Sequence, residues 1–139
     1  MRQYFHQLTL PATTRGLMDF TSQLQGVLRQ SQLRDGIMNL LLQHTSASLL
    51  IQENADPDVR RDLDMFFSQL VMDGDPRFMH RAEGDDDMAA HIRTALTSVH
   101  LAIPFQNGEL SLGTWQGVYL WEHRTHAHPR KILIHCLGT

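Results

Sequence analysis

The sequence contains little cysteine, few aromatic residues and no long apolar run. Its one cysteine, Cys136, excludes an internal disulfide. The apolar segment 132–137 around it indicates a buried, inert thiol rather than a catalytic nucleophile. No apolar segment approaches the length that spans a bilayer, and residues 1–6 lack the apolar centre of a signal peptide. We therefore expect a cytoplasmic protein that has no membrane partner.

An excess of charge of one sign is also missing. The 12 basic and 15 acidic residues are mixed along the chain and give a formal net charge of -3. No basic face is therefore expected, which argues against a nucleic-acid partner. The length of 139 residues, of which 42% are hydrophobic, is sufficient for one core. We expect a single domain over residues 1–139.

Histidine, in contrast, is abundant. Nine histidines in so short a chain supply neutral nitrogen ligands for metals and proton carriers that work near neutral pH. Their positions relative to the predicted helices and strands therefore select the candidate site.

Three segments have the residue spacing of amphipathic helices. The first follows a cap at Thr13 or Thr14, the second begins at Asp56-Pro57, and the third follows Asp85 or Asp86. The residues predicted to face the core are Leu17, Phe20, Leu24, Val27 and Leu28 in the first helix, Val59, Leu63, Phe66, Phe67 and Leu70 in the second, and Met88, Ile92, Ala95, Leu96 and Val99 in the third.

Seven further segments have the length and composition of strands. They are residues 3–10, 37–43, 46–52, 101–105, 109–114, 118–123 and 131–137. Asn107-Gly108 is typical of the two-residue turn of a β-hairpin. Strands gathered into antiparallel groups, with helices between the groups, predict an α+β fold rather than an alternating parallel one.

Polar residues interrupt the two predicted buried strands 37–43 and 46–52. His44 and Ser46 lie at this joint, and such groups must be satisfied by one another, by water or by a ligand. A turn held by local Thr and Ser hydrogen bonds is the alternative interpretation. Asp56 is explained as a helix cap, whereas Glu53, at the end of the second strand, is free to act.

Two histidines flank the acidic segment before the third helix. His80 in the preceding connection and His91 in the helix could provide half of a metal site, and the acids between them could support it or hold magnesium. Their spacing matches no standard short metal motif. Alternatively, the acids simply favour the positive end of the helix dipole, although this does not explain His80.

His123 ends a predicted strand, and His126 and His128 follow it in a loop. We interpret the loop pair as solvent-exposed. Trp115 lies among glycines and is interpreted as a fold or interface element. Ser46 or Ser48 beside His44 could indicate a hydrolase, but the strand-turn-helix elbow around a nucleophilic serine is absent.

Several separate blocks of the sequence together resemble the YjbQ-like family, also called secondary thiamine-phosphate synthase. The blocks are Gln43-His44-Thr45-Ser46-Ala47-Ser48-Leu49, residues 53–60, His80-Arg81-Ala82-Glu83-Gly84, Asp86-Asp87-Met88 with His91-Ile92, and residues 112–118 with Glu122-His123-Arg124. The resemblance covers essentially the whole chain.

The resemblance implies a two-sheet β-sandwich of about seven strands with flanking helices, assembled as a homotrimer. It further implies a pocket that binds a divalent metal ion, zinc or magnesium, through His44, His80, His91 and His123. The implied reaction joins a hydroxymethylpyrimidine diphosphate to a thiazole phosphate. In this hypothesis His44, Glu53, Ser46 and Arg124 act in catalysis on a phosphorylated small molecule.

Two other functions fit the same residues. A non-catalytic trimer that binds a metal or a metabolite would need the histidines but not the neighbouring acids and hydroxyls. A metal-dependent hydrolase would use the same ligands to activate water.

Overall fold

In the computed structural model, which describes residues 1–126 and 128–139, eight strands form two antiparallel sheets and three helices accompany them. The larger sheet has the order β1 (Arg2–Leu10), β8 (Arg130–Gly138), β3 (Gly36–Leu42), β5 (His100–Gln106) and β6 (Glu109–Leu110). The smaller sheet has the order β2 (Gly16–Asp19), β7 (Gln116–Glu122) and β4 (Ala47–Glu53). The predicted α+β fold with two sheets is confirmed.

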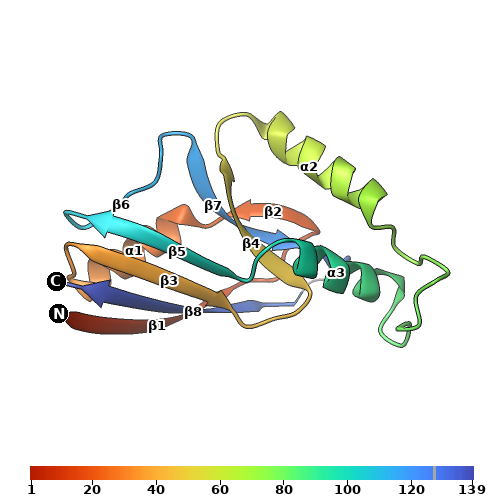
Figure 1. The fold of residues 1–139 in the computed structure, drawn as a ribbon, viewed down its shortest axis with the longest axis horizontal. Coiled ribbons are helices and arrows are strands. Elements are labelled where there is room, and N and C mark those ends of the chain that lie inside the picture. The colour runs from red at the N-terminus through yellow and green to blue at the C-terminus, as the bar shows by residue number, and fades with distance from the viewer. Residues whose placement is uncertain (127) are drawn as a thin grey trace.

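The helices are α1 (Thr21–Ser31), α2 (Pro57–Leu70) and α3 (Asp85–Leu96). In Figure 1, α2 and α3 lie at the end of the molecule away from both chain termini, which lie side by side. The core contains side chains of both sheets, such as Leu40 and Leu120, together with Leu24 of α1. None of the helices in the described residues is both long and apolar enough to cross a membrane.

The predicted first helix starts too early. Residues 16–19 form strand β2, in which Leu17 pairs with Trp121 of β7, so sheet pairing overrides the helical spacing. Helix α1 begins only at Thr21, where Asp19 Oδ1 accepts hydrogen bonds from the Thr21 amide, at 2.9 Å, and hydroxyl, at 2.6 Å. This short strand accounts for the eighth strand beyond the seven expected.

The predicted start of α2 is confirmed, but its buried stripe is wrong. Asp56 Oδ1 accepts from the Asp58 amide at 2.9 Å, with Pro57 in the first turn. However, Phe66 is 60% and Leu70 58% exposed, because α2 contacts the smaller sheet along only one side, as where Phe67 packs on Trp121. The helix lies at the edge of the molecule in Figure 1.

Helix α3 buries the opposite side from the one predicted. Its buried residues are Asp86, Asp87, Ala89, Ala90 and Arg93. By contrast, Leu96 of the predicted core face is 57% exposed. The charged side chains are buried because each has polar partners in the surrounding loops, and this burial positions the candidate site.

The Asn107-Gly108 turn is confirmed, with φ of 53° and 79° at its two residues. The second strand of that hairpin is shorter than predicted, because only Glu109 and Leu110 pair with β5. Beside this turn, Gly36 of β3 pairs with Phe105 of β5. Gly36 lies so close to β8 that a Cβ there would overlap the carbonyl oxygen of Leu137.

Candidate metal centre

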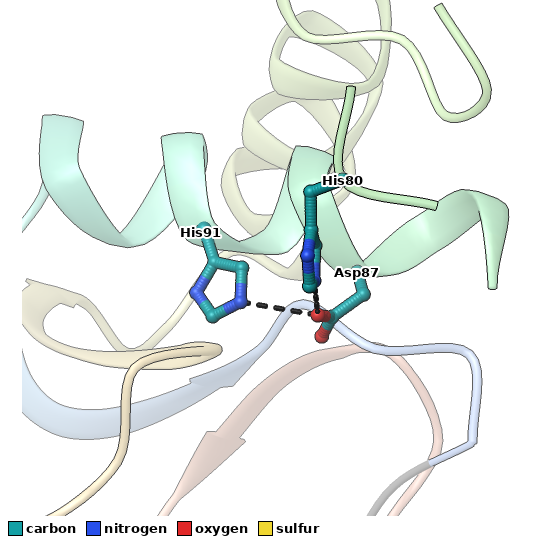
Figure 2. Close-up of side chains that lie close together, drawn as sticks. All are labelled: His80, Asp87 and His91. Atoms are coloured by element: carbon teal, nitrogen blue, oxygen red, sulfur yellow. Dashed lines mark hydrogen bonds and ion pairs between the residues drawn. The ribbon is translucent and has the colours of Figure 1, made fainter. Parts of the chain in front are cut away.

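Three side chains converge beside the first turns of α3 (Figure 2). His80 comes from the connection before the helix, while Asp87 and His91 lie one turn apart on the helix itself. Their ligand atoms all lie within 4.8 Å of one another. Asp87 Oδ2 lies 2.6 Å from Nε2 of His80 and 3.1 Å from Nε2 of His91. Two imidazole nitrogens are therefore directed at one carboxylate oxygen.

The backbone fixes the orientation of the His91 ring. Its Nδ1 lies 2.9 Å from the carbonyl oxygen of Thr45, which can only accept a hydrogen bond. Nδ1 therefore carries the proton, and in the neutral ring the lone pair of Nε2 points towards Asp87. A carbonyl that holds the far nitrogen of an imidazole is the usual support of a metal-ligating histidine.

Arg124 holds the carboxylates of α3 from the other side. Its Nη1 lies 2.8 Å from Asp87 Oδ1, its Nε donates to Asp86 Oδ2 at 2.8 Å, and its Nη2 donates to the Glu83 carbonyl at 2.9 Å. Burial alone would raise the pKa of Asp86, but the hydrogen bonds from Arg124 and from the Thr125 amide lower it to about 2. Asp87 therefore offers one oxygen to Arg124 and the other to the histidines.

The cluster is open on one side only. The Asp87 side chain is 2% exposed, whereas those of His80 and His91 are 40% and 33% exposed. Burial opposes ionisation of Asp87, yet its hydrogen bond with His80 and the charge of Arg124 leave its pKa below the usual value. An ionised carboxylate thus lies at the base of the cluster, and two imidazoles line its accessible face.

The chain resembles known proteins along nearly its whole length. Residues 6–139 match the family described as UPF0047 protein YjbQ-like. The UPF0047 protein of Synechocystis sp. is 49% identical over 99% of this chain and 93% of its own length. The UPF0047 protein YjbQ of Escherichia coli O157:H7 is 41% identical over 94% of both chains. The chain belongs to the UPF0047 YjbQ-like family.

Solved structures of similar proteins agree with this assignment. A conserved hypothetical protein from Thermus thermophilus has a TM-score of 0.85 and 31% identity, and the match covers 95% of this chain and 99% of that one. A YbjQ-like protein of unknown function from Sulfolobus solfataricus has a TM-score of 0.88 at 22% identity, covering 99% of both chains, and shows the shared fold.

Two of the four predicted ligands of this YjbQ-like chain lie outside the cluster. His44 Nε2 accepts a hydrogen bond from the Lys131 amide at 2.8 Å. His123 is 1% exposed, and its Nε2 lies 2.8 Å from the Ser48 hydroxyl. Burial, followed by the charges of Arg93 and Arg15, lowers the pKa of His123 to about 3, so this ring is neutral. The described residues therefore combine His80 and His91 with Asp87 rather than with two more histidines.

Ser46 and Arg124, both predicted to act in catalysis, are engaged within the protein. The Ser46 hydroxyl accepts from Arg130 Nη2 at 3.0 Å, and Arg130 also forms a fully buried ion pair with Glu122 at 2.6 Å. The Arg124 side chain is 11% exposed and is directed at the carboxylates of α3. Both side chains are therefore held by neighbouring residues of the protein.

Glu53 lies far from the cluster within one chain. It ends β4, whereas Thr45, which contacts His91, precedes the start of that strand at Ala47. Six residue steps at about 3.3 Å each separate the two ends of β4 by roughly 20 Å. Glu53 Oε2 accepts instead from the amides of Ala55 and Asp56, at 3.1 and 2.6 Å. The expected proximity of Glu53 to the histidines is thus not found.

Sequence reasoning missed Asp87 as a direct member of the site. The signal was present, because an acid and a histidine four residues apart lie on the same side of a helix. The acids of this segment were interpreted together, as partners of the helix dipole, as support for the ligands or as ligands of magnesium. His126 and His128 are exposed, as predicted, and Ala127 between them lies outside the described residues.

Proposed function

We propose that this protein is a metal-dependent enzyme that acts on a phosphorylated small molecule, with His80, Asp87 and His91 as the metal ligands. The observation that supports this most is the approach of two Nε2 atoms to Asp87 Oδ2. Each of these three atoms can offer a lone pair. Three such lone pairs are stable close together when a cation lies between them.

The type of donor atom favours zinc over magnesium. Two imidazole nitrogens and one carboxylate are typical of catalytic zinc and of other first-row transition metals, whereas magnesium prefers oxygen ligands and retains water. Three protein ligands leave coordination positions free, and the partly exposed rings of His80 and His91 leave room there for a substrate. A divalent ion at this position would supply Lewis-acid catalysis, stabilising negative charge on a phosphoryl oxygen.

The surrounding residues then have defined tasks. The Thr45 carbonyl orients the His91 ring, and Arg124 fixes the Asp87 carboxylate so that Oδ2 points at the histidines. The ion pair between Arg130 and Glu122, each 1% exposed, joins the start of β8 to the end of β7. Such fixed side chains reduce the reorganisation that a reaction at the site would otherwise need.

Within this class, thiamine-phosphate synthesis is the specific reaction that we propose from the sequence resemblance. The thiazole nitrogen would form a bond to the pyrimidine methylene carbon as the bond from that carbon to the diphosphate oxygen breaks. Pyrophosphate would carry the electron pair away, and positive charge at the site would stabilise it.

The proposal is tested by metal analysis and turnover of the purified protein. We expect about one equivalent of transition metal in the wild type and in His44→Ala, but a loss of metal in His80→Ala, because His44 lies outside the cluster. Thiamine-phosphate synthesis and hydrolysis of a generic phosphate ester are measured in parallel. Equal metal content in all three proteins would refute the ligand assignment.

The turnover assays separate the remaining functions. Metal-dependent ester hydrolysis without thiamine-phosphate formation would indicate a hydrolase. Metal binding without either reaction would favour a non-catalytic binding module. The wild type and His80→Ala are compared in both assays, so that an activity independent of the metal ligands is recognised.

We also propose that the protein works as a homotrimer in the cytoplasm. The exposed apolar residues of α2, including Phe66 and Leu70, support association through this helix. Light scattering on the eluted protein should give three times the chain mass of 15.9 kDa. A mass of one chain at micromolar concentration would contradict the trimer.

A further inference from the structure

A second site candidate is a cavity of about 400 Å³ between α2, α3 and the smaller sheet. Its volume is within the range of small-molecule pockets. Arg15, Arg61 and Arg93 contribute to its lining, and Asp64 is the acid among the lining residues. The members of the metal cluster do not line this cavity. It is therefore distinct from the site described above.

Arg93 is the unusual member of this lining. Its side chain is 4% exposed, and its Nε has no hydrogen-bond partner among the described residues. Nη2 donates to the Val71 carbonyl at 2.6 Å, which anchors one end of the guanidinium. A buried donor without a partner costs about 1–3 kcal/mol, more if the group is charged. This arrangement favours a ligand or an ordered water that accepts from Arg93.

The charge of Arg93 is only partly balanced. Asp73 lies 3.5 Å from Arg93, but both of its oxygens already accept from Arg15, at 2.7 and 3.1 Å. Asp64 accepts from the Trp121 indole at 2.8 Å, and burial raises the pKa of Asp64. Burial, followed by the charge of Arg15, lowers the pKa of Arg93. Burial and the charge of Arg15 thus disfavour the Arg93 cation, and a bound anion would offset both effects.

The rest of the lining is neutral and, apart from Met65 and Ser68, aromatic. The rings of Phe67 and Trp121 contact each other at 4.8 Å between centroids, in an edge-to-face arrangement. His123 lines the cavity as a neutral ring. The cavity lining therefore combines guanidinium groups with flat apolar surfaces.

We propose that this cavity binds a phosphate monoester whose organic part is a flat, apolar ring. The guanidinium groups of Arg93 and Arg61 contact the phosphate oxygens, and the organic ring packs on Phe67 and Trp121. Arg61 can contribute because its pairing with Asp58, at 3.1 Å, is on the surface and both side chains are mostly exposed. This binding does not depend on the metal or on the reaction proposed above.

The binding is measured through the fluorescence of Trp121, in a Trp115→Phe background. Trp115 is 63% exposed and does not line the cavity, so its removal leaves Trp121 as the reporter. The protein is stripped of metal with a chelator, which is then dialysed away. Inorganic phosphate and phenyl phosphate are titrated at pH 8 in Tris buffer, with chloride to keep the ionic strength constant. Acetate is titrated in the same way.

Variants that change the charge of the cavity in opposite directions test the assignment. Arg61→Gln should weaken phosphate binding roughly threefold, in keeping with an exposed charge. Asp64→Asn keeps an oxygen for the Trp121 indole but removes the repelling charge, so binding should tighten roughly threefold. Arg29→Gln is the matched control, because Arg29 is on α1 and 69% exposed. It should leave binding unchanged.

Arg93 itself is replaced by lysine, which keeps the charge but not the planar fork. We expect Arg93→Lys to weaken binding roughly tenfold, and near-ultraviolet circular dichroism checks that the variant is folded. Phenyl phosphate should bind more tightly than inorganic phosphate, and acetate more weakly. A wild type without a saturable response, or equal effects of Arg61→Gln and Arg29→Gln, would overturn the proposal. Acetate binding as tightly as phosphate would overturn the phosphate assignment.

Discussion

Asp87→Asn should strongly weaken metal binding while leaving the metal-free fold largely intact. An asparagine can turn its oxygen to Arg124 and its amide to the two histidines, where it donates to their Nε2 lone pairs. The two contacts of the metal-free cluster are thereby replaced by hydrogen bonds of the opposite direction, but the anionic ligand is lost. Asp85, exposed in the same first turn, provides the control variant Asp85→Asn with the same change of charge.

The expected effect on thermal stability follows from linkage. A ligand at a hundred times its Kd adds about 2.7 kcal/mol to the free energy of unfolding. Unfolding entropy of about 2.1 cal/mol/K per residue gives about 0.29 kcal/mol/K for the 139 residues. Zinc should therefore raise the Tm of the wild type by about 9 °C. If Asp87→Asn lowers the affinity a hundredfold, the same zinc concentration adds only about 0.4 kcal/mol, or about 1–2 °C.

The assay is differential scanning calorimetry of metal-free protein, with and without zinc at the same free concentration. The wild type and Asp85→Asn should show the large increase in Tm, and Asp87→Asn the small one. The reasoning would be refuted if Asp87→Asn kept the full increase, or if zinc left the Tm of the wild type unchanged.

Three further predictions concern the stability of the fold. The pKa of Asp86 is about 2, below its ordinary value of 3.8, and this difference contributes about 2 kcal/mol to the free energy of unfolding. The contribution is present above pH 4 and is lost as the pH falls towards 2. The free energy of unfolding should therefore depend less on pH over this range in Asp86→Asn than in the wild type. Glu122→Gln leaves Arg130 buried without its counter-charge and should cost about 3–5 kcal/mol in urea unfolding, whereas replacing both residues with apolar ones should cost less. Gly36→Ala places a methyl group against the backbone of β8 and should cost roughly 1–3 kcal/mol by the same measurement, while Gly26→Ala in α1, with open space around it, should not destabilise.

Much of the fold could be predicted because its strands are short apolar runs bounded by polar turns. The Asn107-Gly108 turn has a local cause, and its positive φ values follow from the two residues themselves. Strand β2 could not be predicted in the same way. Its four residues continue a helical spacing, and only the antiparallel pairing of Leu17 with Trp121, more than a hundred positions away, makes them a strand. Local patterns do not contain such pairings.

The candidate site was predicted in part for a related reason. His80 and His91 were selected because polar residues at the edge of an element need partners, which is a local argument. Asp87 was not singled out among the neighbouring acids because its partner Arg124 lies 37 positions further along the chain. Glu53 was expected near the histidines from the family resemblance, but the two ends of its strand lie about 20 Å apart.

Helix α3 connects these successes and failures. The general rule that an amphipathic helix buries its apolar side predicted Met88 and Leu96 as core residues, yet the helix buries Asp87 and Arg93 instead. Burying charged groups is costly unless they are paired. Asp87 is paired with Arg124, whereas the Nε of Arg93 has no hydrogen-bond partner among the described residues. A helix that buries charged side chains is typical of a functional site. The rule that a helix buries its apolar side is broken mainly where chemistry or binding requires it. Two of the three buried charges of α3, Asp87 and Arg93, contribute to two different candidate sites, the metal cluster and the arginine-lined cavity. The unexpected orientation of one helix therefore positions residues of both sites.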